Sequence, residues 1–450
     1  MVNTGDTAWI LTSAALVLLM TPGLALFYGG MVRAKSVLNM MMMSFGALAL
    51  ISVLWVLYGY SMAFGNDVGF GLLGDPTEYL GLAGLMEDTT SEAGGLPAMA
   101  FVGFQAVFAI ITVALISGAI ADRAKFGAWM VFAGVWATIV YFPVAHWVFD
   151  FTLTDDDGTV THVGGWIANN LAALDFAGGT AVHINAGAAG LALALVLGKR
   201  KGFGKDLFRP HNLPLVMIGA GLLWFGWFGF NAGSAVAANN TAAVAWVNTL
   251  VATGAATLAW LLVEKIRDGH STSLGGASGV VAGLVAITPA CGSVSPLGSI
   301  AIGAIAGALC ALAVGLKYRF GYDDSLDVVG VHLVGGLVGT ILIGLFADPA
   351  SPAGVAGLFY GGGVDQLWRQ VVGALAVLVF SFVLTLLIGW VIQKTMGFRI
   401  PEEDEVAGVD GYAHAESGYD FGSLGAGGFR PGTSRSSESG LTKSTEEVSA

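Results

Sequence analysis

VHINAGAAG (residues 182–190) and VHLVGGLVG (residues 331–339) are two similar stretches in separate apolar regions of this 450-residue chain. They share a valine, a histidine and two glycines at matching positions, which pair Val182 with Val331, His183 with His332, Gly187 with Gly336 and Gly190 with Gly339. An acid precedes each histidine, Asp175 by eight residues and Asp327 by five. The repeat predicts that each half of the chain contributes one helix that carries a histidine.

The glycines of each stretch recur three residues apart, so they fall on one helix face, where small residues let helices approach closely. We therefore expect the two histidine helices to cross in contact. A histidine inside an apolar span is costly and is a functional candidate by default, although each imidazole can also simply hydrogen-bond a neighbouring helix. A metal or haem site is the weaker interpretation, because no Cys, Glu or further His lies at ligand spacing. We predict no metal and no cofactor.

Composition places the chain in a lipid bilayer. Hydrophobic residues make up 55% of it and charged residues 11%, against about 45–50% and 25% in ordinary soluble domains. A spanning helix needs about 20 mainly apolar residues. The sequence supplies eleven such runs, at residues 9–32, 37–64, 97–121, 126–148, 176–198, 213–235, 242–264, 273–290, 297–317, 328–346 and 370–396. We expect an all-α integral membrane protein of eleven transmembrane helices; the eighth run is short and rich in glycine, so ten or twelve spans stay open.

Basic residues are concentrated in the odd-numbered loops between these runs, whereas carboxylates dominate the even-numbered loops. Because basic loops are retained on the cytoplasmic side, we expect the N-terminus outside the cell and, after eleven spans, the C-terminus inside. The first run lacks the basic leading region of a cleaved signal peptide, so we expect it to be retained as a helix. The net charge of −12 either attracts cations or reflects a high-salt habitat.

The runs divide into two repeats of five helices and a final helix. Because five is an odd number, the second repeat is expected to be inverted relative to the first, and such folds bind substrate near the midplane. The expected segments are 1–198 for the first repeat with an extracellular N-terminus, 199–212 for a cytoplasmic loop, 213–346 for the second repeat, 347–396 for an outer loop and the eleventh helix, and 397–450 for a cytoplasmic tail. After about residue 421 the tail has too few apolar residues to fold, so we expect disorder there.

An aromatic stretch, GLLWFGWFGFNAGSA (residues 221–235), is the second unusual feature. Rings interleaved with small residues can line a narrow path and face a cation. Packing is the commoner role of aromatic side chains in apolar helices, so it is favoured for Trp224, Trp227 and Phe228. A functional role for Phe230 needs support from elsewhere in the sequence.

Several segments resemble the signature stretches of the ammonium transporter family (Amt/Mep/Rh), and of its Amt branch in particular. They are DFAGGTAVHINAG (175–187), GKRKGFGKDLFRPHNLP (198–214), WFGFNAGSA (227–235), VNTLVAT (247–253), TPACG (288–292) and DVVGVH (327–332). These segments extend across most of the chain and contain residues that hydropathy alone does not demand. The resemblance is therefore specific.

The resemblance implies roles for the histidines and the nearby rings. His183 and His332 resemble twin pore histidines, whose imidazoles touch at mid-membrane and share one proton. Trp227 is expected to line the pore beside them. Phe108 and Phe230 resemble the stacked pair that closes the pore on its outer side.

An outer recognition site is implied as well, with the hydroxyl of Ser234 and the ring of Phe108 as parts of a cage for a cation. The family usually has a tryptophan in this cage, but alignment of AHWVFDF (145–151) places Phe149 there. This exchange weakens recognition by about 1 kcal/mol, because tryptophan is the best cation–π partner. Trp147 and Trp166 are the candidates to replace it.

Asp175 resembles an acid near the outer vestibule that holds the site together and favours a cation. Its alternative role is to cap its own helix. Both roles place its carboxylate close to the start of the helix that carries the first histidine.

The function implied is ammonium transport by a chain that is not an enzyme. Ammonium is expected to bind at the outer aromatic site, lose a proton and pass as ammonia through a hydrophobic pore lined by the two histidines, with proton co-transfer. The alternatives are a passive ammonia channel of the Rh type and an ammonium sensor. The resemblance also implies a homotrimer in the plasma membrane, a cytoplasmic PII-type signal protein that meets the tail at residues 397–420, and no nucleic-acid partner.

Overall fold

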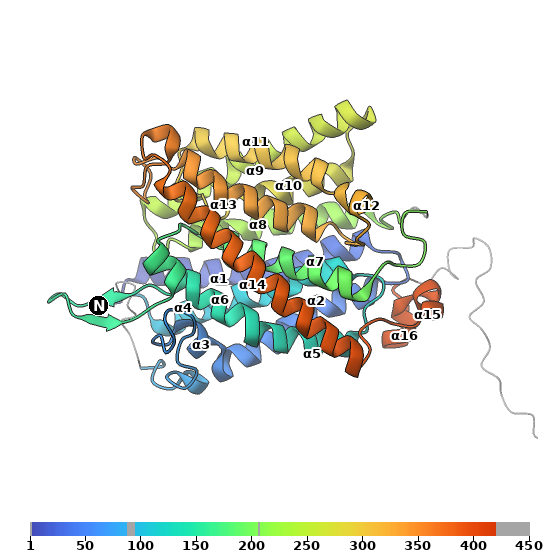
Figure 1. Cartoon of the computed structure of the whole chain (residues 1–450), viewed down its shortest axis with the longest axis horizontal. Helices are drawn as coiled ribbons and strands as arrows, with labels where there is room; N and C mark the ends of the chain where they lie inside the picture. The colour runs from blue at the N-terminus through green and yellow to red at the C-terminus, as the bar shows by residue number, and fades with distance from the viewer. Residues whose placement is uncertain (1, 88–94, 206–207, 420–450) are drawn as a thin grey trace, which may run out of the picture.

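The computed structural model describes residues 2–87, 95–205 and 208–419, and long apolar helices dominate this part of the chain (Figure 1). Ten helical stretches within it are long and apolar enough to cross a membrane: Thr4–Met31 (α1), Val37–Phe64 (α2, η1, α3), Ala98–Ile120 (α4, η3), Phe126–Phe149 (α5, η4, α6), Gly179–Leu197 (η6, α7), Leu213–Gly233 (α8), Asn240–Asp268 (α9), Pro296–Phe320 (α11, α12), Val329–Phe346 (η7, α13) and Asp365–Thr395 (α14). A shorter apolar helix, Ser273–Ile287 (α10), follows α9.

Short turns of π- or 3-10 helix interrupt several of these stretches. Their parts are α2 (Val37–Leu54), η1 (Trp55–Gly59), α3 (Tyr60–Phe64), α4 (Ala98–Ile116), η3 (Ser117–Ile120), α5 (Phe126–Trp136), η4 (Ala137–Tyr141), α6 (Phe142–Phe149), η6 (Gly179–Ile184), α7 (Asn185–Leu197), α11 (Pro296–Ala313), α12 (Leu316–Phe320), η7 (Val329–Leu333) and α13 (Val334–Phe346). The remaining elements are η2 (Leu80–Leu82), β1 (Leu153–Thr154), β2 (Val160–His162), η5 (Ile167–Leu171), η8 (Leu358–Tyr360), α15 (Glu402–Ala407) and α16 (Val409–His414).

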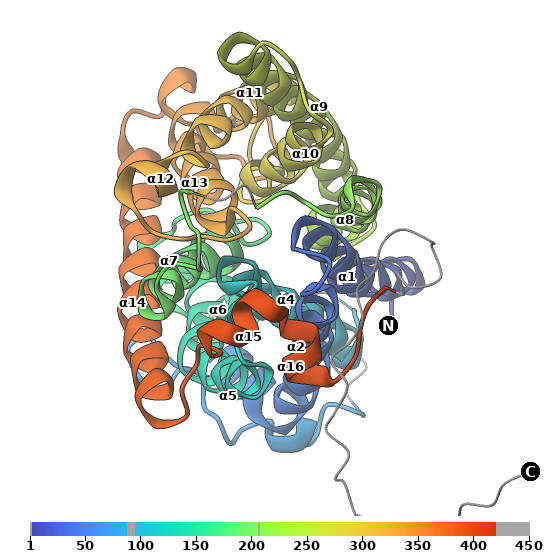
Figure 2. The ribbon, with the colours of Figure 1, turned by 90° about the vertical axis from the view of Figure 1, so that its right-hand side faces the viewer.

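The β-hairpin and the last two helices mark opposite ends of the helix bundle, which we name the hairpin end and the tail end (Figure 1). The strands β1 and β2 pair antiparallel, with Leu153 opposite His162. At the other end α15 and α16 cover part of the bundle, and α16 packs against α2 (Figure 2). The disorder predicted after about residue 421 lies outside the described residues.

The predicted spans agree with these helices in position, so the all-α, multi-pass architecture is confirmed. The eighth predicted run, 273–290, is helical only as far as Ile287, because the chain turns between Ile287 and Ser293. The resulting helix has 15 residues, fewer than the roughly 20 that a straight span needs. The described residues thus contain ten helices that are long and apolar enough to cross a membrane, plus the shorter α10.

Two groups of helices, α1–α7 and α8–α13, lie side by side when the molecule is viewed from the tail end, and α14 runs along one side of both (Figure 2). The groups meet where α1 packs along α8. A Cβ atom on Gly226 of α8 would lie 2.6 Å from the carbonyl oxygen of Leu16. Only glycine therefore allows this close approach, which is how small residues bring membrane helices together.

Candidate functional site

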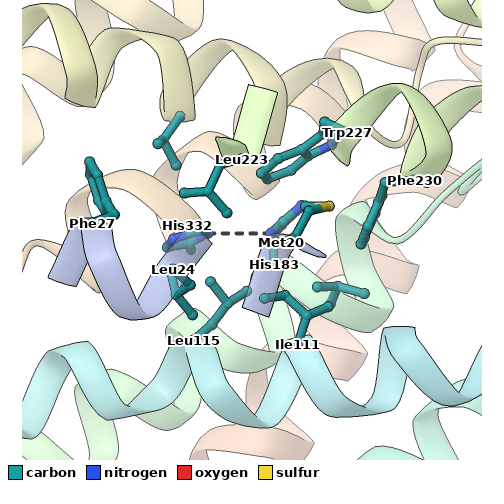
Figure 3. Close-up of a pocket in the computed structure, with 12 residues that line it drawn as sticks. Met20, Leu24, Phe27, Ile111, Leu115, His183, Leu223, Trp227, Phe230 and His332 are labelled. Atoms are coloured by element: carbon teal, nitrogen blue, oxygen red, sulfur yellow. Dashed lines mark hydrogen bonds between the residues drawn. The ribbon is translucent and has the colours of Figure 1, made fainter. Parts of the chain in front are cut away.

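The two repeat histidines meet inside the bundle (Figure 3). His183 lies in η6 and His332 in η7, so each occupies a turn of π-helix, and both side chains are buried. Their Nδ1 atoms are 3.3 Å apart, and their ring centroids are 5.4 Å apart with 25° between the planes. At this distance one ring can donate an N–H to the lone pair of the other.

Close approach of the two histidine helices depends on two of the predicted glycines. A Cβ atom on Gly187 would lie 2.5 Å from the backbone nitrogen of Leu333, and one on Gly336 would lie 3.1 Å from Cβ of His183. Any larger residue at these positions pushes the helices apart. The predicted contact between the two helices is confirmed.

A carboxylate caps the first turn of each histidine helix. Asp175 accepts hydrogen bonds from the backbone N–H groups of residues 178–180, at 2.6 to 2.7 Å, and from the hydroxyl of Thr180. Asp324 accepts them from Val328 and Val329, at 3.1 and 2.7 Å. These N–H groups have no partner within their own helix, so the carboxylates satisfy donors that lie deep in the protein.

The capping pattern distinguishes between the two acids that precede the second histidine. Asp175 lies eight residues before His183, and Asp324 lies eight residues before His332. Asp324 is therefore the structural counterpart of Asp175, although Asp327 lies nearer to His332 in the sequence. The side chain of Asp327 instead binds Nζ of Lys317 at 2.6 Å.

Aromatic rings lead from the histidine pair toward the hairpin end. The Trp227 ring lies 5.4 Å from that of His183, with 21° between the planes, and its N–H donates to the hydroxyl of Thr288 at 2.7 Å. Phe230 is 6.2 Å from His183, and Phe108 stacks on Phe230 with a centroid distance of 4.1 Å. The structure thus brings the predicted pair of phenylalanines together beside the histidines.

The stacked phenyl rings separate two cavities. The histidine cavity is narrow, since the centre of a water-sized molecule can occupy only about 10 Å³ of it. It is lined by His183, His332, Trp227 and Phe230. The hairpin-end cavity is much wider, about 510 Å³ by the same measure, and Phe108 lines it. Since about 10–15 Å³ suffices for one water molecule, the narrow cavity matches a single small molecule. Both phenylalanines are only 1% exposed, so the path between the cavities is closed.

The predicted recognition residues converge on the hairpin-end cavity. Phe149, Ser234 and Asp175 line it together with Phe108. The Phe149 ring stands edge-on to Phe108, 6.4 Å away with 80° between the planes. The hydroxyl of Ser234 donates to the carbonyl of Phe230 at 2.8 Å, which leaves its oxygen lone pairs available as acceptors.

Neither tryptophan considered as a replacement lies on this cavity. Trp147 donates its ring N–H to the carbonyl of Leu72 at 2.8 Å and packs on Phe380. Trp166 packs against Trp147. The described residues that line the cavity include Phe149 but no tryptophan.

Most of the walls of the histidine cavity could not be recognised from the sequence. They are apolar side chains of α1, α4 and α10, among them Met20, Leu24, Phe27, Ile111, Leu115 and Val281. Nothing in their type separates them from lipid-facing neighbours on the same helices. On the hairpin-end cavity a signal did exist, because Gln105 is a polar residue within an apolar run and lines the wall.

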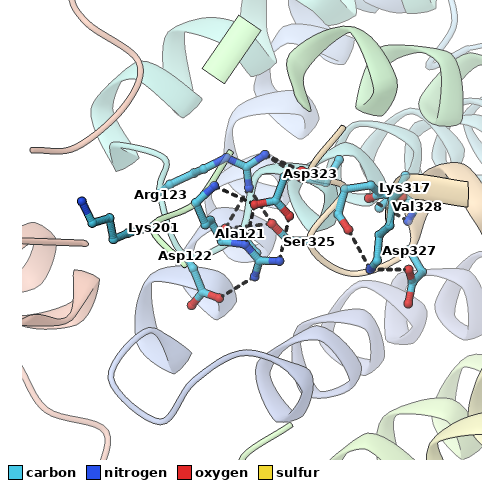
Figure 4. A network of polar contacts seen from close by, with 12 residues as sticks. Ala121, Asp122, Arg123, Lys201, Lys317, Asp323, Ser325, Asp327 and Val328 are labelled. Atoms are coloured by element: carbon cyan, nitrogen blue, oxygen red, sulfur yellow. Dashed lines mark hydrogen bonds and ion pairs between the residues drawn. The ribbon is translucent and has the colours of Figure 1, made fainter. Parts of the chain in front are cut away.

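A buried network of charges closes the tail end (Figure 4). Arg200 binds both carboxylate oxygens of Asp323, each at 2.9 Å, and one oxygen of Asp122 at 3.0 Å. Arg123 donates to the hydroxyl of Ser325 and to the carbonyl of Asp323, each at 2.6 Å. Burial raises the pKa of Asp323, but hydrogen bonds and charge from Arg200, with the charge of Arg123, hold it below its ordinary value. Burial lowers the pKa of Arg123 to about 10, so the residue stays charged at neutral pH.

The tail docks onto this network through two acids. Glu405 of α15, which is 1% exposed, accepts hydrogen bonds from the backbone of Lys201 and from the guanidinium of Arg399, each at 2.6 Å. Asp410 of α16 accepts from the backbone of Leu38 and Asn39, at 3.1 and 2.8 Å, and so caps the start of α2. The helices α15 and α16, which belong to the predicted tail segment 397–450, therefore pack against the bundle.

Comparison with known proteins agrees with this architecture. The model of the Ammonium Transporter Family matches residues 8–419. An ammonium transporter of Mycobacterium bovis is 63% identical over 437 residues, which cover 93% of this chain and 90% of that protein. The crystal structure of Mep2 from Saccharomyces cerevisiae matches with a TM-score of 0.80 and 34% identity, over 89% of this chain and 88% of that one. A solved structure described as a sensor Amt protein matches with a TM-score of 0.82 and 27% identity, over 91% and 98%. This multi-pass membrane protein belongs to the ammonium transporter family.

Proposed function

We propose that this chain transports ammonium by binding the ion in the hairpin-end cavity, removing a proton, and passing ammonia between Phe108 and Phe230 to the histidine pair. One observation carries the proposal: two stacked rings separate a wide cavity with polar groups from a narrow one lined by two histidines. The substrate is supported by the name of the matching family and of its relatives.

Selectivity follows from the cost of moving charge through an apolar constriction. Ammonium resembles potassium in size and charge, and a pore open to any monovalent cation would dissipate a membrane potential worth about 2.3 kcal/mol per charge per 100 mV. Ammonium can give up a proton, whereas potassium cannot. The closed contact of Phe108 and Phe230 penalises the ion and admits neutral ammonia.

The recognition site consists of Phe108, Phe149 and Ser234, with Asp175 behind it. The rings offer their faces to a cation, and the Ser234 oxygen offers an acceptor. Asp175 directs its oxygens to the backbone of its own helix, so it acts through its charge and by fixing the wall of the cavity. Asp175 can therefore cap its own helix and favour a cation in the cavity at the same time.

The histidine pair offers ammonia hydrogen-bonding partners in the narrow cavity. The facing Nδ1 atoms, 3.3 Å apart, share one proton in this proposal. Nε2 of His183 is buried and, among the described residues, lacks a hydrogen-bond partner, so it is available to ammonia. Trp227 holds the His183 ring in place by stacking on it.

The full topology forms part of the proposal. We infer eleven spans, with α10 and the turns that follow it completing the eighth, and two inverted repeats bounded at 1–198 and 213–346. The loop 199–212 separates the repeats, and the segment 347–396 holds an outer loop and the eleventh helix. The hairpin end then faces outward and the tail segment 397–450 lies in the cytoplasm, in agreement with the buried arginines at the tail end.

A homotrimer in the plasma membrane and a PII-type signal protein at the tail are proposed from the family alone. We propose that such a signal protein meets the chain at the tail end, where α15 and α16 pack on the bundle.

The test is the transient current of purified protein in liposomes after a jump in ammonium concentration, with potassium as the comparison ion. The double variant His183→Ala with His332→Ala is compared with His270→Ala, a matched control because that histidine is exposed on a loop. A saturable current for ammonium alone, lost or made permeable to potassium only in the double variant, supports net ammonium transport with proton co-transfer. Internal alkalinisation without current indicates the passive ammonia channel. If neither current nor internal alkalinisation is seen, transport is refuted and the sensor is favoured, the role after which one structural neighbour is named.

A further inference from the structure

A second cluster of titratable residues lies beside the hairpin-end cavity and has no part in the mechanism described above. It consists of His146 of α6, Asp150 at the end of that helix, His162 of β2 and Asp67 of the loop after α3. Both histidines and Asp150 are buried, and Asp150 also lines the hairpin-end cavity. We name these four residues the His146 cluster.

The His146 ring is surrounded by oxygen acceptors on both sides. Its Nδ1 lies 3.1 Å from Oδ2 of Asp150 and 3.2 Å from the carbonyl oxygen of Ala63, and its Nε2 lies 3.4 Å from Oδ1 of Asp67. A neutral imidazole carries one N–H, so one of its nitrogens then presents a lone pair to an acceptor. Only a ring protonated at both nitrogens satisfies both sides, and the cluster is therefore built to hold one extra proton.

The two carboxylates of the cluster are fixed as acceptors. His162 places its Nε2 at 2.9 and 3.0 Å from the two oxygens of Asp150. Burial raises the pKa of Asp67, but the backbone N–H groups of residues 71, 69 and 73 and the nearby His146 outweigh it and hold the pKa below the ordinary value. Asp67 is thus ionised at neutral pH, and an extra proton goes to the ring of His146.

We propose that the His146 cluster accepts the proton that ammonium releases in the hairpin-end cavity. The inference rests on the proposed function, since it names the acceptor for that deprotonation. Among the described residues, the titratable groups facing the ring are those of the cluster itself: Asp67 from the loop after α3 and Asp150 at the end of α6, with His162 of β2 bound to Asp150.

The proton transfer balances in two steps. An N–H bond of ammonium breaks, the electron pair stays on nitrogen, and ammonia leaves toward Phe108 while a proton binds an oxygen of Asp150. That proton then passes from Asp150 to Nδ1 of His146 across 3.1 Å, in the neutral tautomer whose N–H lies on Nε2 and faces Asp67 at 3.4 Å without a hydrogen bond. The imidazolium that forms lies between two carboxylates, which stabilise its charge. Deprotonation of the cluster resets it for the next ion.

The experiment compares wild-type protein with Asp67→Asn, which removes one of the carboxylates that stabilise the imidazolium and keeps the size of the side chain. Asp156→Asn is the matched control, because it removes the same charge from the exposed tip of the hairpin. Asp67→Glu restores the charge and tests rescue. Ammonium-driven current in liposomes gives the saturating rate and the half-saturating concentration, and ¹⁵N-histidine spectra, with the His146 signal assigned through His146→Gln, report the protonation of that ring.

We expect Asp67→Asn to lower the saturating rate about tenfold, the effect of about one pKa unit, because the imidazolium loses one of the two carboxylates that stabilise it. The half-saturating concentration should stay unchanged. In the wild type the His146 signal should change from neutral imidazole to imidazolium when ammonium is supplied, and in Asp67→Asn this change should be lost. Asp156→Asn and Asp67→Glu should keep both the rate and the signal. A normal rate in Asp67→Asn, or a neutral His146 in the wild type during ammonium supply, overturns the inference and leaves the proposed function intact. If instead the wild type carries no ammonium current and causes no alkalinisation, the proposed function fails, whatever the spectra show.

Discussion

Replacement of Phe149 by tryptophan tests the recognition site directly. The ring lines the hairpin-end cavity and stands edge-on to Phe108 at 6.4 Å, and a cavity of about 510 Å³ leaves room for the larger indole. Tryptophan exceeds phenylalanine as a cation–π partner by about 1 kcal/mol at such a site. Since 1.4 kcal/mol is a factor of ten in affinity, we expect the half-saturating ammonium concentration to fall about fivefold in Phe149→Trp.

The measurement is the initial ammonium current in liposomes over a range of concentrations, with the maximal rate as internal reference. Phe70→Trp is the control, because Phe70 is 97% exposed and does not line the cavity. The maximal rate should stay within about twofold of the wild type, because the added interaction acts at binding and not at the closed constriction. An unchanged half-saturating concentration in Phe149→Trp, or an equal change in Phe70→Trp, contradicts a cation site at this ring.

Three further predictions concern the constriction and the tail end. Phe230→Ala removes a ring between the two cavities, so potassium current should appear in liposomes where the wild type has none; a variant as tight to potassium as the wild type shows that the rings do not exclude ions. Glu405→Gln replaces the buried carboxylate that binds the guanidinium of Arg399 with a neutral amide and should weaken tail docking by about 1–3 kcal/mol. The loss is measured as faster proteolysis after α14, and Glu403→Gln, at an exposed residue, should leave the proteolysis rate unchanged. The pKa of Asp323 is lowered in the folded protein, so its pairing with Arg200 stabilises the fold fully above a pH of about 4, and this stabilisation is lost as the pH falls through the lowered pKa. The melting temperature in detergent should therefore fall less steeply in that acidic range for Asp323→Asn than for the wild type.

The sequence predicted the helices well because membrane spans leave a strong signal. Uninterrupted apolar runs of about 20 residues are typical of spanning helices and longer than soluble folds need. Ten of the predicted runs therefore coincide with the ten helices of the described residues that are long and apolar enough to cross a membrane. The exception, α10, ends early because the chain turns after Ile287 while its residues stay apolar. Hydropathy reports burial in lipid or protein and does not report backbone geometry.

The candidate site was predictable where its residues are unusual for their surroundings. His183 and His332 are costly in apolar helices, and the repeat linked them, so their contact followed from the sequence. The capping partner Asp324 was missed because Asp327 lies nearer in the sequence, and only the backbone N–H geometry distinguishes them. The His146 cluster was missed because its acids and histidines come from three separate elements.

The capping acids explain how this fold can hold histidines deep inside. A buried helix start exposes N–H groups that have no intrahelical partner and no water to bind. Asp175 and Asp324 each satisfy such groups eight residues before a histidine, so each histidine turn begins within the protein rather than at its surface. Burial, followed by the nearby charge of Asp327, raises the pKa of Asp324 to about 6. The two halves of the chain therefore share an arrangement as well as a residue: a carboxyl cap that lets a helix start where its histidine has to face its partner.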